Sequence, residues 1–233
     1  MTHPPPIVAR MHSHVERWTA CADDRALFLR CYSMMTGNVF ATAEGDGFGD
    51  RDWVVRLLHR FADYYFDGLD AFERAPESAP AVWRQAHRLA ADPDAAPIQK
   101  LLLGVNAHIN YDLVLTLVDL LEPEWGALSP EARGGRYEDH CRINDVIGRT
   151  IDAVQDEVVE PAMPFMAYVD RWLGPLDEAL VSGVITRWRE GVWRHAVAVL
   201  DAPTTASRDQ LVRRVEAEAL RTGGLVCPRA RHL

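Results

Sequence analysis

Apolar residues recur at helical spacing along almost the whole chain, and no stretch alternates apolar and polar residues as a half-buried strand does. The spacing therefore predicts an all-α protein. The expected helices cover residues 7–22, 25–42, 52–73, 81–91, 98–121, 137–159, a short stretch ending at 173, 176–200 and 208–222. A loop rich in Pro and Gly is expected over residues 122–136.

Capping signals set several of the expected boundaries. Asp23-Asp24 and Asp50 stand where N-caps are needed for the second and third helices. Ser207 with Gln210 three residues later has the spacing of a capping box, and Gly223 is the expected helix end. We therefore predict a single-domain helical bundle of roughly eight helices over residues 1–223, followed by a C-terminal tail over 224–233.

Composition narrows the classes of partner. The 233 residues carry 25 basic and 34 acidic side chains, a net charge of −9, and no basic stripe that would neutralise the phosphates of a nucleic acid. The sequence predicts no membrane span, because no uninterrupted apolar run approaches the ~20 residues that a spanning helix needs. The start lacks the apolar stretch of a signal peptide, and the four cysteines are scattered, so we expect a cytoplasmic protein. A small-molecule substrate is the expected partner, and a homo-oligomer is left open.

The most apolar predicted helix contains the polar residues of greatest interest. Asn106, His108 and Asp112 lie within residues 98–121, and His108 and Asp112 are four apart, on one face of a helix. A carboxylate inside an apolar helix costs several kcal/mol unless it is paired or ligated. Two explanations stay open: the pair holds two helices together by a hydrogen bond, or it forms a catalytic or metal-binding site.

A second pair with the same spacing lies in the predicted helix 137–159. His140 and Asn144 share the apolar side of that helix, and Asp139 is adjacent. Facing helices of all-α proteins build metal sites from such pairs, so zinc, iron or manganese is one expectation for His108, Asp112, His140 and Asn144. The other expectation for His140 and Asn144 is a buried hydrogen-bonded pair. His59 and Asp63 have the same spacing and are expected at or near the surface.

The segment LLLGVNAHINYDL, residues 101–113, resembles the signature of an actinobacterial family of uncharacterised, domain-of-unknown-function proteins. The stretches FGDRDWVVRLLHRFADYYFDGL and RWREGVWRHAVAVL fit the same family. The resemblance implies an all-α protein and directs attention to Asn106, His108, Asp112 and Asn144. It implies no particular reaction.

Two further resemblances suggest chemistry. The pair His108 and Asp112 is similar to the HxxxD ligand pair of zinc-dependent phospholipase C and single-strand nucleases, although Asn144 stands where their second pair has Glu. Asn144, Gly148 and Asp152 have the spacing of the second magnesium motif of class I terpene synthases, with Gly148 and Asp152 as variants. The second resemblance implies a magnesium ion and an apolar substrate in an aromatic pocket.

Together these patterns give three hypotheses for function. The first is an enzyme that hydrolyses a phosphate or other ester, with His108 and Asp112 as metal ligands or as base and orienting residue. Tyr111 and Asp139 would assist, and Asn106, Tyr64 and Trp188 would contact substrate. The second is a biosynthetic cyclase or lyase, and the third a non-catalytic helical protein that binds a ligand or partner.

Overall fold

A computed structural model of the chain describes residues 4–154 and 178–227, and within these ranges it contains helices and no strand. This confirms the predicted all-α class. The α-helices are α1 (Pro6–Ala20), α2 (Arg25–Glu44), α3 (Arg51–Arg74), α4 (Ala81–Ala90), α5 (Pro97–Ala107), α6 (Leu113–Trp125), α7 (Pro130–Val154), α10 (Glu178–Leu200) and α11 (Thr205–Val226). A 3₁₀ turn, η1 (Pro76–Ser78), precedes α4, and a π-helical turn, η2 (His108–Asp112), joins α5 to α6.

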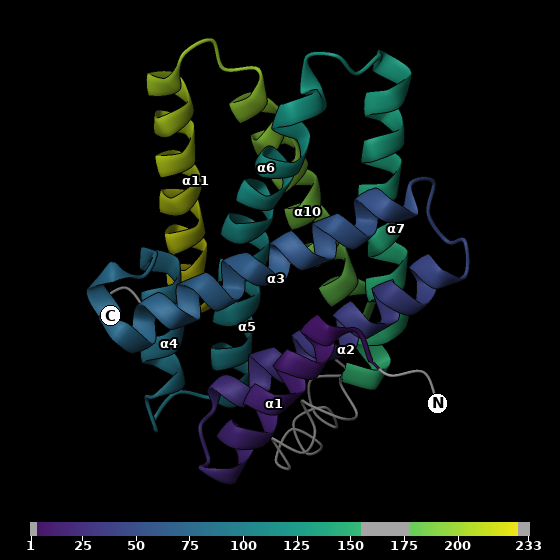
Figure 1. The fold of residues 1–233 in the computed structure, drawn as a ribbon. Helices are drawn as coiled ribbons and strands as arrows, with labels where there is room; N and C mark the ends of the chain where they lie inside the picture. The colour runs from purple at the N-terminus through teal and green to yellow at the C-terminus, as the bar shows by residue number, and fades with distance from the viewer. Residues whose placement is uncertain (1–3, 155–177, 228–233) are drawn as a thin grey trace.

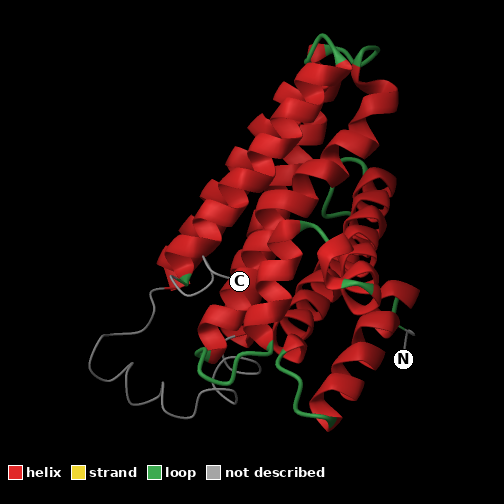
Figure 2. Cartoon of the chain, turned by 90° about the vertical axis from the view of Figure 1, so that its left-hand side faces the viewer, coloured by secondary structure: helices red, strands yellow, loops and turns green. Residues whose placement is uncertain are grey.

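The helices form a bundle in which α5, η2 and α6 together make the central rod. Figure 1 shows α6, α7, α10 and α11 side by side, with α3 crossing in front of them. The central rod touches α11 and α4 through α5 and touches α10 and α3 through α6. Figure 2 shows the same bundle from the side as an elongated stack of helices.

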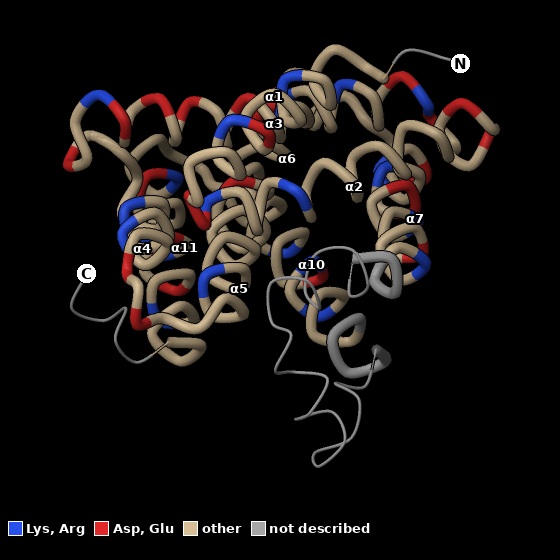
Figure 3. Tube along the Cα trace, turned by 90° about the horizontal axis from the view of Figure 1, so that it is seen from below, with Lys and Arg blue, Asp and Glu red and all other residues tan. Residues whose placement is uncertain are grey.

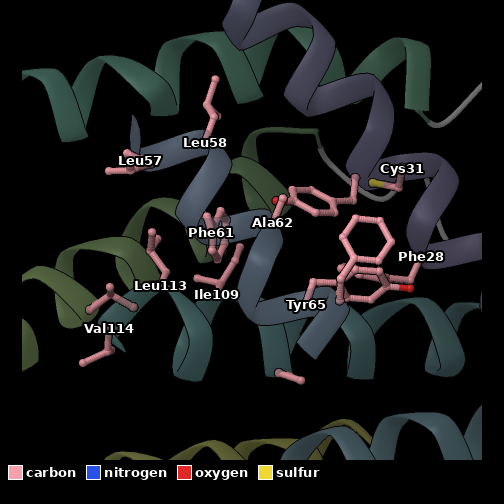
Figure 4. Close-up of a cluster of buried hydrophobic side chains, with 14 of the residues drawn as sticks. Phe28, Cys31, Leu57, Leu58, Phe61, Ala62, Tyr65, Ile109, Leu113 and Val114 are labelled. Carbon is pink, nitrogen blue, oxygen red and sulfur yellow. The ribbon is translucent and has the colours of Figure 1, made fainter. Parts of the chain in front are cut away.

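The central rod is the most apolar part of the chain. Pro97–Trp125 is the one described helical segment whose length and composition would suit a membrane span, and 72% of its most apolar window is buried inside the protein. Leu113 and Leu117 on this rod are fully buried. Figure 4 shows Ile109, Leu113 and Val114 of the rod beside Phe61 of α3. The apolar surface of the rod is thus buried against neighbouring helices of the bundle.

The first turn of α3 is capped by the predicted residue, and a carboxylate from α7 also binds the loop that precedes it. The Asp50 carboxylate accepts a hydrogen bond from the backbone N–H of Trp53 (2.9 Å), which confirms the predicted N-cap. The backbone N–H groups of Gly49 and Asp50 in turn donate to the carboxylate of Asp139 on α7, at 2.6 and 2.7 Å. The loop before α3 is therefore tied to α7 by a buried carboxylate.

Two predicted boundaries around residues 122–136 are wrong. The helix α6 continues through Pro123 to Trp125, and α7 already begins at Pro130. Leu121 and Trp125 are buried, and the Trp125 indole N–H donates to Asp201 at 2.7 Å. Burial of this last turn stabilises the helix more than the loss of the backbone hydrogen bond at Pro123 destabilises it. This burial depends on distant residues, so the sequence around Pro123 does not indicate it.

The last helix also differs from the prediction. Its N-cap is Thr204, in a reciprocal capping box with Ser207, and the helix passes Gly223 to end at Val226. Gly223 therefore lies inside the helix, where a Cβ would meet the side chain of Gln85 on α4. The expected tail therefore begins later than residue 224. The predicted short helix ending at 173, Pro161 and Pro164 lie outside the described residues.

Charged side chains are distributed over most of the helices. In the view from below, Lys and Arg alternate with Asp and Glu along the described tube (Figure 3). Lys100 is an exception to the surface placement of charge: its side chain is buried and its ammonium group contacts the Asp24 carboxylate at 2.6 Å. This ion pair connects the start of α5 to the turn between α1 and α2.

Candidate functional site

The π-helical turn His108–Asp112 lies at the middle of the central rod, where the sequence predicts an uninterrupted α-helix. The backbone N–H of Leu113 bonds the carbonyl of His108, five residues earlier. The Thr116 hydroxyl donates to the carbonyl of Asp112 at 2.8 Å and satisfies an acceptor at this irregular turn. Single π turns inside α-helices occur often at functional sites, so the turn marks this position for closer study.

His108 and Asp112 form a buried dyad on this turn. The two atoms Nδ1 of His108 and Oδ2 of Asp112 are 3.0 Å apart, and both residues are almost fully buried. The indole N–H of Trp83 on α4 donates to both oxygens of Asp112, at 3.1 and 3.0 Å. The carboxyl group is therefore held from two sides and in turn fixes the orientation of the imidazole.

Aromatic rings hold the His108 imidazole in place. The Phe61 ring of α3 stacks on it, with centroids 3.5 Å apart and an angle of 7° between the planes. The Tyr32 ring of α2 meets it edge-on at 4.2 Å. With Nδ1 engaged by Asp112, the second ring nitrogen, Nε2, is buried and has no hydrogen-bond partner within the described part of the chain. Buried polar atoms normally have partners, so an unpaired imidazole nitrogen requires an explanation.

Burial changes the protonation behaviour of the dyad. It lowers the pKa of His108 well below its usual value and raises the pKa of the Asp112 carboxyl well above its usual value. The hydrogen bond from Trp83 acts against the shift in the pKa of Asp112. Both shifts arise because a low-dielectric interior disfavours charged forms. Burial therefore favours the neutral form of both groups, the imidazole and the carboxylic acid.

A small apolar cavity of about 100 Å³ borders the dyad. Among its lining residues are His108, Tyr32 and Phe61, whereas Asp112 is not one of them. His108 therefore forms part of the cavity wall, while Asp112, bonded to its Nδ1, lies outside that wall. The remaining walls come from α2, α3, α5, η2, α7 and α10: Phe28, Cys31, Met35, Thr36, Val39, Leu57, Leu58, Val105, Ile109, Ile143, Ile147, Ile185 and Arg189. Figure 4 shows how Phe28, Cys31 and Phe61 gather in this part of the core.

Two hydroxyl groups add to the polar content of the cavity wall. Tyr32 and Thr36 lie one turn apart on α2, and neither hydroxyl makes a hydrogen bond of normal geometry with a described residue. Burial raises the pKa of Tyr32 well above its usual value, and the neighbouring Thr36 hydroxyl acts in the opposite direction. Both hydroxyls therefore stay protonated at neutral pH and are available as hydrogen-bond donors.

His140 and Asn144 meet Arg189 of α10. The Arg189 Nε donates to the Asn144 side-chain oxygen at 2.5 Å, and its Nη2 donates to the His140 carbonyl at 2.8 Å. The His140 Nε2 donates to the Arg189 carbonyl at 3.1 Å. The pair therefore ties α7 to α10 through hydrogen bonds, which supports the hydrogen-bonded interpretation of these two residues.

No group of three or more His, Cys, Asp or Glu side chains in the described ranges is arranged to hold a metal ion. His108 with Asp112 supplies two of the expected ligands, while His140 and Asn144 surround a guanidinium group, whose positive charge disfavours a cation. Asp152 of the magnesium spacing lies in a stretch whose side chains are not described. A divalent metal (zinc, iron, manganese or magnesium) stays a sequence-based prediction.

The other predicted site residues are placed away from the dyad. Asn106 is buried and bridges α5 to α11 by donating to the Ala219 carbonyl at 2.9 Å. The Tyr64 hydroxyl donates to Asp119 at 2.7 Å. Trp188 packs partly buried against the core, outside the lining of the cavity. These three therefore have structural contacts that explain their positions.

The expected assistants of catalysis are also displaced from the cavity. Tyr111 lies on the π turn, is partly buried, and has its pKa raised to about 12 by burial. It does not line the cavity. Asp139 is engaged by the loop before α3, as described above. His59 and Asp63 are both exposed, which confirms their surface placement.

Sequence reasoning missed three contributors to the site. The sequence does not distinguish Phe61 and Tyr32 from the other core aromatic residues, because only the tertiary fold brings their rings to His108. Arg189 carried a signal that could have been used: it is a charged residue on the predicted helix 176–200 and lies close to apolar Val192 and Trp193. Its burial at 3% exposure makes it a charged side chain within the core.

Comparison with known proteins places the chain in a family. A family model described as "Family of unknown function (DUF5995)" matches residues 5–228. The chain belongs to this family. No curated protein and no solved structure matches it. The family relationship thus covers nearly the whole chain and confirms a domain of unknown function, while the chemistry must be argued from the site itself.

Proposed function

We propose that the protein is an enzyme that transfers a proton to or from a small, largely apolar molecule through Nε2 of His108. The observation that carries this proposal is that His108 lines an apolar cavity and has a buried Nε2 without a described hydrogen-bond partner, on an imidazole held by Asp112. A ring nitrogen so placed and backed by a carboxyl group is the arrangement of a general acid–base catalyst. Such proton transfer starts or ends eliminations, isomerisations and cyclisations.

The apolar walls favour cyclase or lyase chemistry over phosphate hydrolysis. A phosphate monoester carries about two negative charges, and Arg189 among the lining residues could balance one of them, so burying the other would still cost several kcal/mol. A small carbonyl compound, in contrast, would place its carbon skeleton against Phe61 and Ile109. The hydroxyls of Tyr32 and Thr36 would supply hydrogen bonds to an oxygen atom that gains negative charge. The cavity is smaller than the roughly 300–1,000 Å³ pockets of drug-sized ligands, so the substrate is small.

Hydrogen–deuterium exchange tests this proposal without knowledge of the natural substrate. The protein is incubated in D₂O with a panel of small ketones, esters and nitroalkanes, and loss of carbon-bound hydrogen is followed by NMR. We expect the wild type to accelerate exchange in at least one compound, and His108→Gln to abolish the acceleration. The matched control is His59→Gln, because His59 is exposed and lies outside the cavity lining.

A non-catalytic ligand-binding protein is the second candidate, favoured by the apolar lining of the cavity. The same panel separates the two. Compounds that bind, as seen by shifts of the NMR signals of cavity residues, but show no exchange that depends on His108 would contradict the catalytic proposal and support the binding one.

A further inference from the structure

Arg189 is a buried cation without a described counterion. Its side chain lies on α10 at 3% exposure, and no carboxylate among residues 4–150 and 183–227, whose side chains the structure describes, forms an ion pair with it. The three acceptors that it does reach, the Asn144 amide oxygen, the His140 carbonyl and Nδ1 of His140, are neutral. Its third nitrogen, Nη1, makes no hydrogen bond to any described residue.

The guanidinium remains charged in this position. Burial lowers the pKa of Arg189 to about 10, which is still well above neutral pH. His140 adds no second charge, because burial and the adjacent Arg189 lower its pKa well below the usual value. A single positive charge is therefore held beside neutral groups, an arrangement that is costly unless an anion completes it.

The position of Arg189 relates it to the proposed catalytic group. Arg189 and His108 both line the cavity, the first from α10 and the second from the π turn. Between them the walls are apolar, with Ile109, Ile143 and Ile185 among the lining residues. The cavity thus combines one cationic group, one imidazole and an aliphatic interior.

We propose that the ligand of this cavity is a small aliphatic carboxylic acid whose carboxylate binds the guanidinium of Arg189. An arginine can pair with a carboxylate through two parallel N–H···O bonds, and the anion would supply the charge that the described residues do not. The aliphatic body of the acid would occupy the isoleucine-lined space and reach the imidazole of His108. The orientation toward His108 rests on the proposed function, whereas the binding of a carboxylate does not.

Two isosteric probes test the charge requirement. Isovalerate and isovaleramide have the same shape, but only the first is an anion at neutral pH. Binding of each to the full chain is measured by calorimetry or by NMR. We expect isovalerate to bind wild-type protein at least tenfold more tightly than isovaleramide. Equal affinity for the two probes, or binding of neither, would overturn the proposal.

Variants of Arg189 locate the effect. Arg189→Met is expected to remove the tenfold preference while retaining weak binding of both probes. Because Arg189 also ties α7 to α10, its circular dichroism and melting temperature are measured first. If this variant does not fold, Arg189→Lys replaces it. Lysine keeps the charge but lacks the planar fork, so the preference should fall several-fold. Unchanged preference in a folded variant would assign the anion to another group.

A third variant separates this proposal from the proposed function. His108→Gln is expected to lose proton exchange with neutral ketones but to retain the preference for isovalerate. Loss of the preference in this variant while Arg189→Met keeps it would overturn the assignment to Arg189. Wild-type protein that prefers isovalerate but exchanges no protons would retain the carboxylate site and reject the catalytic role of His108.

Discussion

The imidazole of His108 lies flat on the ring of Phe61, with ring centroids 3.5 Å apart and planes 7° from parallel. The contact joins the central rod to α3 at the wall of the cavity, which both residues line. It restricts rotation of the imidazole about its Cβ–Cγ bond, as the hydrogen bond to Asp112 does from the other edge. Stacking and hydrogen bonding together fix the direction in which Nε2 points.

Replacing Phe61 tests this orientation. Phe61→Leu should lower the free energy of unfolding by about 1–2 kcal/mol, through lost packing and stacking. It should also reduce proton exchange that depends on His108, because the imidazole gains freedom. Phe40→Leu is the matched control, since Phe40 is equally buried at 8% exposure but does not line the cavity. Urea unfolding and the exchange assay measure both effects, and equal exchange in the two variants would contradict the stacking role.

Asp112→Asn tests the carboxyl group with little change of shape. The Asn oxygen can still accept from the Trp83 indole, while its NH₂ group must donate to Nδ1 of His108. In this arrangement the imidazole proton lies on Nε2 and prevents that atom from accepting another, whereas the carboxyl group of Asp112 can also accept from the N–H of Nδ1 and leave Nε2 free. The exchange rate should fall by about 10³–10⁴-fold, the order seen when an orienting carboxylate is amidated. Nitrogen-15 NMR of His108 should report the changed tautomer in a folded protein, and an unchanged exchange rate would reject the dyad.

Asp139→Asn separates loop anchoring from catalysis. The Asp139 carboxylate accepts from the backbone of Gly49 and Asp50 and contacts Arg142 at 3.4 Å. An amide can accept one of these bonds but presents a donor to the second, so stability should fall by about 1–3 kcal/mol. The proton exchange rate per folded molecule should stay at the wild-type value. A folded variant that has lost exchange would return Asp139 to the active site.

The pH dependence of stability should depend on His87. Burial and the nearby charge of Arg25 together lower the pKa of His87 to about 3, against the smaller opposing effect of Asp23. The unfolded chain binds the same proton near the ordinary value of about 6.5. Between these values the unfolded state holds more protons, so the stability that neutral His87 contributes is lost as pH falls from about 6.5 toward 3.

His87→Phe removes this proton and keeps the ring that stacks on Trp83 at 5.2 Å. The melting temperature of the variant should therefore decline less steeply than that of the wild type between pH 6.5 and 4. The control measurement is the melting temperature at pH 7.5, where the two proteins should be similar. Parallel pH profiles would mean that His87 is already protonated in the folded state.

Two glycines in helices should respond oppositely to alanine. A Cβ at Gly104 on α5 would stand 2.6 Å from Cγ of Phe28, whereas a Cβ at Gly37 on α2 meets nothing within 4 Å. Gly104→Ala should destabilise the protein by about 1–3 kcal/mol by overpacking. Gly37→Ala should stabilise it by about 0.5–1 kcal/mol through helix propensity. Chemical denaturation measures both, and destabilisation by Gly37→Ala would contradict the open space around it.

Local signals were sufficient for the fold class and for most helix positions. Periodic apolar residues and the Asp50 cap act within one helix or one turn, so they can be recognised without knowledge of the neighbours. The ends near Trp125 and Gly223 were missed, because burial against Asp201 and close packing on Gln85 decide them. These contacts join residues more than 70 positions apart and leave no local trace.

The candidate site was predictable only in part. The spacing of His108 and Asp112 was informative because a helix by itself brings them together. The predicted meeting with His140 and Asn144 required knowledge of which helix faces which, and the structure instead brings them to Arg189. The spacing of residues within one helix does not indicate which residues of another helix they contact.

The π turn has a consequence for the helix that contains it. A helix with 3.6 residues per turn advances by about 100° per residue, so the extra residue of the π turn shifts the faces of α6 relative to those of α5 by that angle. Because of this offset, α5 packs against α4 and α11, while α6 packs against α3 and α10. A one-residue deletion within 108–112 would restore a regular helix and rotate the buried face of α6 away from its neighbours. The turn that places His108 at the cavity therefore also sets the rotation of α6, with its neighbours α3 and α10, relative to α5, with its neighbours α4 and α11.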